Sequence, residues 1–200
     1  MIPVVKYANG DCQNDSTFVL ERVDQLYSSR PIIPAEPLNR FYSLLLEDMF
    51  DEWGTKIMFG MRWLEQVDQE WSARYLLYDG VLGSGLHLSQ LTDMGKQFGS
   101  RQVGRMKIVG CDNSVMVERS LTSLLTSLEH HLERGSMFML GATPTVADFA
   151  LYGQLSQIII DRSGDKYDLD LFSTPFLSCI GWLTWPILLL TRYFERLFTQ

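Results

Sequence analysis

The sequence is poor in cysteine and has no excess of basic residues. Its three cysteines, Cys12, Cys111 and Cys179, lie far apart and form no CxxC pair. This pattern argues against a disulfide-stabilised secreted domain and favours a reducing compartment. Lysine and arginine number 17 against 24 aspartates and glutamates, for a net charge of −7. Nucleic acid is therefore not an expected partner, because phosphate neutralisation needs a surplus of basic side chains.

Targeting and metal-binding patterns are also missing. The first residues show no charged segment followed by an apolar one, so we expect no secretory signal and a cytoplasmic location. His87 stands alone, and the adjacent His130 and His131 lack the i, i+4 spacing that presents two ligands to one metal. Glycines 80, 83 and 85 follow neither the dinucleotide-binding pattern nor a P-loop. The sequence therefore predicts no metal site, and these glycines are expected in a loop or hinge.

Proline is scarce outside one segment, where Pro31, Pro34 and Pro37 follow one another at intervals of three residues. Each proline fixes its own φ and biases the preceding residue toward extended geometry, so neither a helix nor a central strand is expected there. The sequence therefore predicts a stiff linker over residues 30–37. This linker separates an N-terminal unit, residues 1–29, from a larger body.

The N-terminal unit is predicted to form two short strands and a helix. Val4–Tyr7 is rich in strand formers, residues 8–11 suit a turn, and Cys12 with Gln13 can pair back as a second strand. Helical spacing of apolar residues begins after Asp15. A lone two-stranded ribbon is marginal in water, so the unit must either dock on the body or be the remainder of something larger.

The body, residues 38–167, is predicted to be all-helical. Within residues 41–64, apolar side chains recur every three or four positions and predict one long helix with a single apolar stripe. The tryptophans Trp53, Trp63 and Trp71 are expected in the core. Further helical segments are predicted over residues 71–78, 88–109, 117–132 and 145–160.

The segment from Thr145 to Asp148 has the pattern of a capping box. In such a box the threonine hydroxyl accepts a hydrogen bond from the amide three residues on, and the carboxylate reaches back to the threonine amide. Alone, the box predicts a helix start and nothing else. In its context, residues 141–152, GATPTVADFALY, resemble the start of the buried core helix in the C-terminal domain of glutathione transferases. Ala150 and Gly153 are expected to allow close approach of neighbouring helices there.

The resemblance to glutathione transferases covers about residues 2–165. Ile2-Pro3-Val4-Val5, then Asn14-Asp15-Ser16-Thr17, then the proline-rich linker and residues 41–63 follow the order in which that family leaves its thioredoxin-like domain and enters its helical one. The resemblance implies a mainly α fold. It consists of a glutathione transferase-type helical bundle preceded by a truncated thioredoxin-like ββα fragment, and the capping box is a folding element in it.

The same resemblance implies a glutathione site. Pro3 matches the proline that is cis in this fold, where the backbone of the preceding residue, here Ile2, pairs with the cysteinyl part of glutathione. Asp15 and Ser16 match the acidic-or-amide residue and serine at a helix start, where free amides suit the γ-glutamyl carboxylate. The family usually has Glu or Gln where Asp15 stands. Read without the family, Asp15 and Ser16 simply cap a helix.

The resemblance implies an activity that this chain does not complete. The thiol-activating Tyr, Ser or Cys of the family precedes the cis-proline, and no residue here matches it, so no catalytic residue is assigned and no conjugation by this chain is expected. A full-length form is expected to join glutathione to a hydrophobic electrophile. Members of the family usually dimerise, so the resemblance also implies a possible homodimer. Two alternatives remain, namely a non-catalytic helical adaptor and a tail-anchored membrane relative.

The C-terminal tail, residues 168–200, is hydrophobic. Residues 171–191 carry no charge and are long enough, at 1.5 Å per residue, to cross a bilayer as a helix of about 30 Å. Pro175, Gly181 and Pro186 interrupt that stretch, which disfavours a membrane span. We expect instead a tail that packs poorly and exposes aromatic surface.

Overall fold

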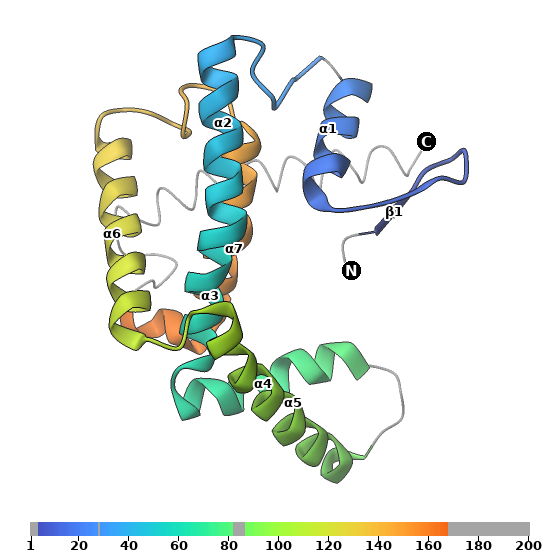
Figure 1. Cartoon of the computed structure of the whole chain (residues 1–200), viewed down its shortest axis with the longest axis vertical. Helices are drawn as coiled ribbons and strands as arrows, with labels where there is room; N and C mark the ends of the chain where they lie inside the picture. The colour runs from blue at the N-terminus through green and yellow to red at the C-terminus, as the bar shows by residue number, and fades with distance from the viewer. Residues whose placement is uncertain (1–3, 28, 82–86, 168–200) are drawn as a thin grey trace.

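The computed structural model describes residues 4–27, 29–81 and 87–167, and it is mainly helical, as predicted (Figure 1). Ile2, Pro3 and the tail that contains residues 171–191 lie outside the described residues. In chain order the elements are β1 (Val4–Lys6), β2 (Cys12–Asn14), α1 (Ser16–Leu26), α2 (Pro37–Met49), the π-helical turn η1 (Phe50–Gly54), α3 (Thr55–Trp63), α4 (Gln66–Val81), α5 (Leu88–Val109), α6 (Ser114–Glu133), α7 (Val146–Ile160) and the 3-10 turn η2 (Arg162–Tyr167).

The N-terminal unit has the predicted order of strand, turn, strand and helix. β1 and β2 pair antiparallel with Val4 opposite Asn14 and Lys6 opposite Cys12. Gly10 closes the turn between them at φ 90°, a conformation that glycine adopts without steric cost. Helix α1 contains no buried residue. Hydrophobic packing therefore contributes little to holding this unit against the rest of the chain.

Hydrogen bonds hold the proline-rich linker between α1 and α7. The Ile32 amide donates to the Asp24 carboxylate at 2.6 Å, and the Ile32 carbonyl accepts from the Val146 amide at 3.0 Å. The Val146 amide is one of the four N-terminal amides of α7 that lack a partner within the helix, so the linker satisfies it. Helix α2 begins at Pro37, the last residue of the predicted linker, because proline suits the first helical turn.

A long helical rod, α2–η1–α3, runs through the body (Figure 1). It corresponds to the single helix predicted for residues 41–64, with the π-helical turn η1 in its middle. Helix α7 packs along α2 and α3, α6 packs against α3, and α4 pairs with α5 at the α3 end. The main core lies around the rod, where Phe50, Trp63, Leu121 and Ile158 are almost completely buried. The Trp63 ring meets Phe98 edge-on, with 5.9 Å between ring centroids.

The apolar stripe predicted along residues 41–64 is buried only in part. Ile57 and Met61, on α3, are buried in the main core. Trp53, four residues before Ile57, is 51% exposed, so its prediction as a core residue was wrong. Trp71 is half-buried and stacks on the Tyr75 ring. The stripe is covered where α6 packs on α3, and α6 has no comparable contact with α2.

Gly60 sets the approach of α3 to α6. A Cβ atom at this position would lie 2.7 Å from Cγ2 of Val117, closer than atoms can pack, and 3.2 Å from the Cys111 carbonyl oxygen, a tight contact. The close approach expected at Gly153 is absent, because a Cβ atom there meets nothing within 4 Å among the described residues. The expectation was wrong for Gly153, and a tight helix contact lies instead at Gly60, in the α3–α6 interface.

Gly60→Ala is expected to destabilise the fold, whereas Gly153→Ala is expected to stabilise it. Overpacking against Val117 costs about 1–3 kcal/mol, which exceeds the roughly 0.5–1 kcal/mol gained when alanine replaces a helical glycine. Urea unfolding followed by circular dichroism measures both effects. Equal stabilisation by the two alanines would show that α3 and α6 are not in close contact. Val117→Ala in the Gly60→Ala background should restore part of the loss.

Candidate functional site

Helix α1 begins at a strained residue. Asp15, its N-cap, has φ 77° and ψ 119°, and its Oδ1 accepts a hydrogen bond from the Thr17 amide at 3.1 Å. A non-glycine residue in such a sparsely populated conformation costs about 1–3 kcal/mol, and such strain is concentrated at functional sites. Ser16 is the first residue of the helix. The structure thus brings two of the four predicted glutathione-site residues together, while Ile2 and Pro3 lie outside its described part.

A buried carboxylate of α2 lies against this helix start. The Thr17 hydroxyl donates a hydrogen bond to Oε1 of Glu47 at 2.7 Å, which links α1 to α2. The side chain of Glu47 is only 7% exposed. Burial raises the pKa of Glu47, and repulsion from Asp51, Asp48 and Asp15 raises it further, against the lowering effect of the Thr17 hydroxyl. Sequence reasoning missed Glu47, which lies on the polar side of the predicted stripe.

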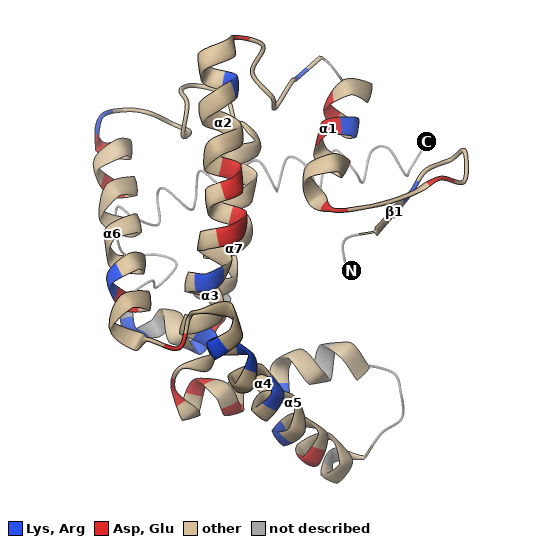
Figure 2. Cartoon of the chain, in the orientation of Figure 1, with Lys and Arg blue, Asp and Glu red and all other residues tan. Residues whose placement is uncertain are grey.

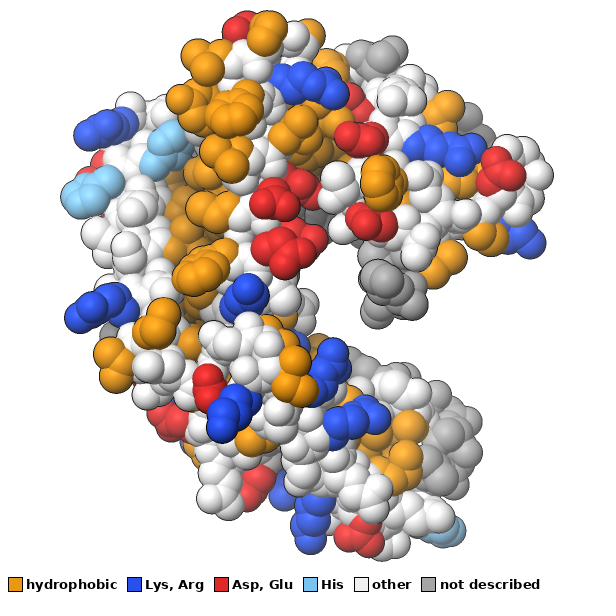
Figure 3. All heavy atoms as spheres, in the orientation of Figure 1, with side chains coloured by type: hydrophobic (Ala, Val, Ile, Leu, Met, Phe, Trp, Pro, Cys, Tyr) orange, Lys and Arg blue, Asp and Glu red, His pale blue; other side chains and the backbone are white. Residues whose placement is uncertain are grey.

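Glu47 belongs to a group of carboxylates that we call the acidic cluster, namely Asp15, Glu47, Asp48, Asp51 and Glu52. Burial and then the neighbouring carboxylates raise the pKa of Asp51 as well. Figure 2 shows acidic residues in the part of the rod between the α2 and α3 labels, and Figure 3 shows acidic side chains gathered between the apolar face of α2 and the N-terminal unit. In the described ranges, no three His, Cys, Asp or Glu residues are grouped to hold a metal ion.

The amides at the start of α1 and the acidic cluster make opposite demands on a ligand. The first-turn amides and the positive end of the helix dipole attract an anion. The cluster attracts a cation and resists further negative charge. A molecule with a carboxylate and an ammonium group a few bonds apart satisfies both.

The capping box predicted from Thr145 and Asp148 is present at the start of α7. The Asp148 carboxylate accepts hydrogen bonds from the Thr145 amide at 2.7 Å, from the Thr145 hydroxyl at 3.0 Å and from the Met139 amide at 2.8 Å. Burial raises the pKa of Asp148, although these three donors act to lower it. All of its contacts are internal, so the box holds the preceding loop onto α7 and does not face a ligand.

A buried ion pair joins α3 to the end of α7, and sequence reasoning missed it. The Arg62 Nε donates to Asp161 Oδ2 at 2.5 Å, and another guanidinium nitrogen donates to the Gln157 side chain at 3.0 Å. Both charged side chains are almost fully buried. The available signal was Arg62 itself, a charged residue within an apolar run. The pair is a structural contact between two helices, because burial leaves it no access to a ligand.

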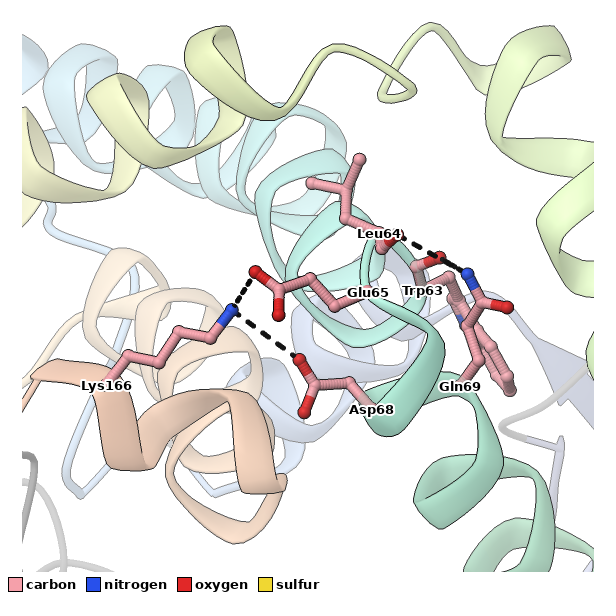
Figure 4. Close-up of polar contacts among 6 residues, drawn as sticks. All are labelled: Trp63, Leu64, Glu65, Asp68, Gln69 and Lys166. Carbon is pink, nitrogen blue, oxygen red and sulfur yellow. Dashed lines mark hydrogen bonds and ion pairs between the residues drawn. The ribbon is translucent and has the colours of Figure 1, made fainter.

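A second candidate site is a surface hollow of about 320 Å³ at the end of α3. Lys166 bonds Glu65 there at 2.5 Å and lies 3.8 Å from Asp68, while Gln69 donates to the Trp63 carbonyl nearby (Figure 4). Its lining residues are Met61, Leu64, Glu65, Asp112, Ser114, Glu118 and Lys166. Carboxylates already neutralise the lysine, so the hollow offers no free charge to an anion. We assign it no ligand.

No protein-family model, curated protein or solved structure matches this chain. The start of α1 therefore stands as the candidate site on its geometry and electrostatics alone. Among the helices that the structure describes, none is both long and apolar enough to span a membrane. Residues 171–191, the stretch considered for that role, lie outside the described residues.

Asp148→Ala is expected to destabilise the fold by about 2–4 kcal/mol, because it leaves the Met139 and Thr145 amides without an acceptor. Asp148→Asn should lose less, since one acceptor oxygen remains. Chemical unfolding measures both variants, with Asp112→Ala, an exposed carboxylate, as the control. A loss from Asp148→Ala no larger than the control's would contradict a structural role for the box.

Glu47→Gln is expected to flatten the dependence of stability on pH. The raised pKa of Glu47 means that the folded chain retains this proton at pH values where the unfolded chain has released it. The stability contributed by Glu47 is therefore complete below its ordinary pKa of 4.5 and is lost as pH rises through the folded-state value. Glutamine stays neutral and can still accept from Thr17.

The free energy of unfolding measured between pH 4 and pH 7 checks this expectation. Glu47→Gln should remove part of the decline toward pH 7, while Glu70→Gln, at an exposed position, should leave the curve unchanged. If the curves of the two variants coincide, Glu47 does not contribute to the pH dependence.

Proposed function

We propose that this chain is a glutathione transferase-like protein that binds the γ-glutamyl end of glutathione at the start of α1. The proposal rests on the order of its elements, a ββα unit followed by a proline-rich linker and a helical body. It rests also on the segment GATPTVADFALY at residues 141–152, which contains the capping box of α7. The transferase-type bundle and the thioredoxin-like nature of the ββα unit are part of the same proposal.

The observation that carries the proposal is the meeting of a helix start with a buried carboxylate, at Thr17 and Glu47. The γ-glutamyl group of glutathione ends in a free carboxylate and an ammonium group on one carbon atom. In the proposed complex, the Ser16 hydroxyl and the first-turn amides of α1 other than that of Thr17, which donates to Asp15, hold the carboxylate. Glu47 and Asp51 attract the ammonium group from the α2 side. The strained backbone of Asp15 keeps these donors in position before the ligand arrives.

The proposed role of the described residues is binding and orientation. Conjugation of the glutathione sulfur to a hydrophobic electrophile, the activity proposed for a full-length form, requires a group that lowers the thiol pKa. We assign that step to no residue in the described ranges. Glutathione is proposed as a ligand and substrate, and the cytoplasm, where it is abundant, as the location.

Calorimetric titration of the purified chain tests the proposal. Glutathione is expected to bind, and the dipeptide Cys-Gly, which lacks the γ-glutamyl group, is expected not to bind. Ser16→Ala should weaken glutathione binding by about 2–10-fold, the effect of one lost hydrogen bond. Ser114→Ala is the matched control, because Ser114 is likewise the first residue of its helix, α6. Binding of Cys-Gly as tight as that of glutathione, or no binding of either, would refute the proposed site.

A further inference from the structure

One face of α2 and η1 is apolar and uncovered among the described residues. Its side chains are each between 40% and 59% exposed. We call this face the α2 stripe; it consists of Leu38, Phe41, Tyr42, Leu45, Met49 and Trp53. The sphere view shows the apolar side chains running along α2 (Figure 3). Six large apolar side chains exposed along one helix face are the kind of patch that signals a contact surface.

The α2 stripe continues into a buried surface. Farther along the same rod, Ile57 and Met61 belong to the main core, which also contains Val117 of α6. The rod thus has one continuous apolar side. Among the described residues, α6 covers this side along α3, and no helix covers this side along α2. An element that covers the α2 half would extend an existing core.

The charges beside the α2 stripe restrict its occupant. Asp48 and Glu52, four residues apart, belong to the acidic cluster that borders the stripe. Lys56 lies over the Trp53 ring, 5.7 Å from its centroid, at the end of the stripe. The occupant must therefore be strongly apolar and carry basic residues that meet Asp48 and Glu52.

Residues 171–200 of this chain have that composition. Residues 171–191 carry no charge, and Arg192, Glu195 and Arg196 follow with a net charge of +1; the two arginines have the same four-residue spacing as the two acidic residues. Residues 168–200 follow η2, which packs against α3, α4 and α7. Thirty-three residues can span up to about 100 Å when extended, whereas the rod of 27 residues is about 40 Å long, so the segment reaches the stripe.

We propose that residues 171–200 cover the α2 stripe, with Arg192 and Arg196 facing Asp48 and Glu52. Covalent attachment favours this occupant over a second copy, because a tethered segment is present at high effective concentration. A second copy packed through the same face offers no basic residue to Asp48 and Glu52, because the six residues of the α2 stripe are all uncharged.

Methionine oxidation by hydrogen peroxide in the full chain tests the proposal. Met49, in the α2 stripe, is 40% exposed, and Met94, on α5, is 39% exposed, so the described structure alone predicts similar rates of sulfoxide formation. If residues 171–200 cover the stripe, Met49 should be oxidised several-fold more slowly than Met94. Met137, at 43% exposed, is a second control. Mass spectrometry of peptides measures all three rates in one sample.

Charge reversal identifies the occupant. Arg192→Glu with Arg196→Glu should raise the oxidation rate of Met49 toward that of Met94 without changing the Met94 rate. Adding Asp48→Arg and Glu52→Arg to that variant should restore protection. Far-ultraviolet circular dichroism confirms that each variant remains folded. Restored protection in the four-residue variant would directly support the predicted pairing.

Two outcomes would overturn the proposal. Equal oxidation of Met49 and Met94 in the unmodified chain would show that nothing covers the stripe. Protection of Met49 that disappears on serial dilution, together with dissociation of a dimer seen by analytical ultracentrifugation, would assign the stripe to a second copy.

Discussion

The arrangement of the described chain depends on one constraint, the continuous helical rod α2–η1–α3 with apolar residues along one side. Helices α6 and α7 both use it as their packing surface, and α4 begins three residues after it ends. Gly60 makes the α3–α6 contact close, and the buried pair of Arg62 with Asp161 fixes α3 against the end of α7. Breaking one partner of such a buried pair leaves an uncompensated charge, so the pair favours a single alignment of the two helices.

Local sequence patterns were sufficient to predict the helices and strands, but they were not sufficient to predict which side chains are buried. The two strands, the turn at Gly10 and the cap at Thr145 follow from short-range chemistry, and the sequence predicted each of them. Periodicity also located the long helix, but it could not show that Trp53 is exposed while Ile57 is buried. That difference depends on where α6 meets the rod, which is a long-range contact. The π-helical turn was missed because the residues of η1 fit an α-helical repeat equally well.

Only the part of the candidate site that depends on a local pattern could be predicted from the sequence. Asp15 and Ser16 form a local helix-start pattern, so their position at the start of α1 could be predicted. Glu47 is thirty residues away from Thr17 in the sequence, and only the tertiary fold brings its carboxylate to the Thr17 hydroxyl. The electrostatic character of the site therefore comes from α2, an element that sequence reasoning treated as an apolar helix.

The attachment of the N-terminal unit is consequently polar and sensitive to charge. Since α1 has no buried residue, it depends on contacts such as the Thr17–Glu47 hydrogen bond and the Asp24–Ile32 bond. Each such bond contributes about 1 kcal/mol, which is small beside the burial of an aromatic residue such as Trp63. An ammonium group near Glu47 would relieve repulsion within the acidic cluster and strengthen the same attachment. A ligand that binds there through an ammonium group would therefore be thermodynamically coupled to the docking of the N-terminal unit, and each would favour the other.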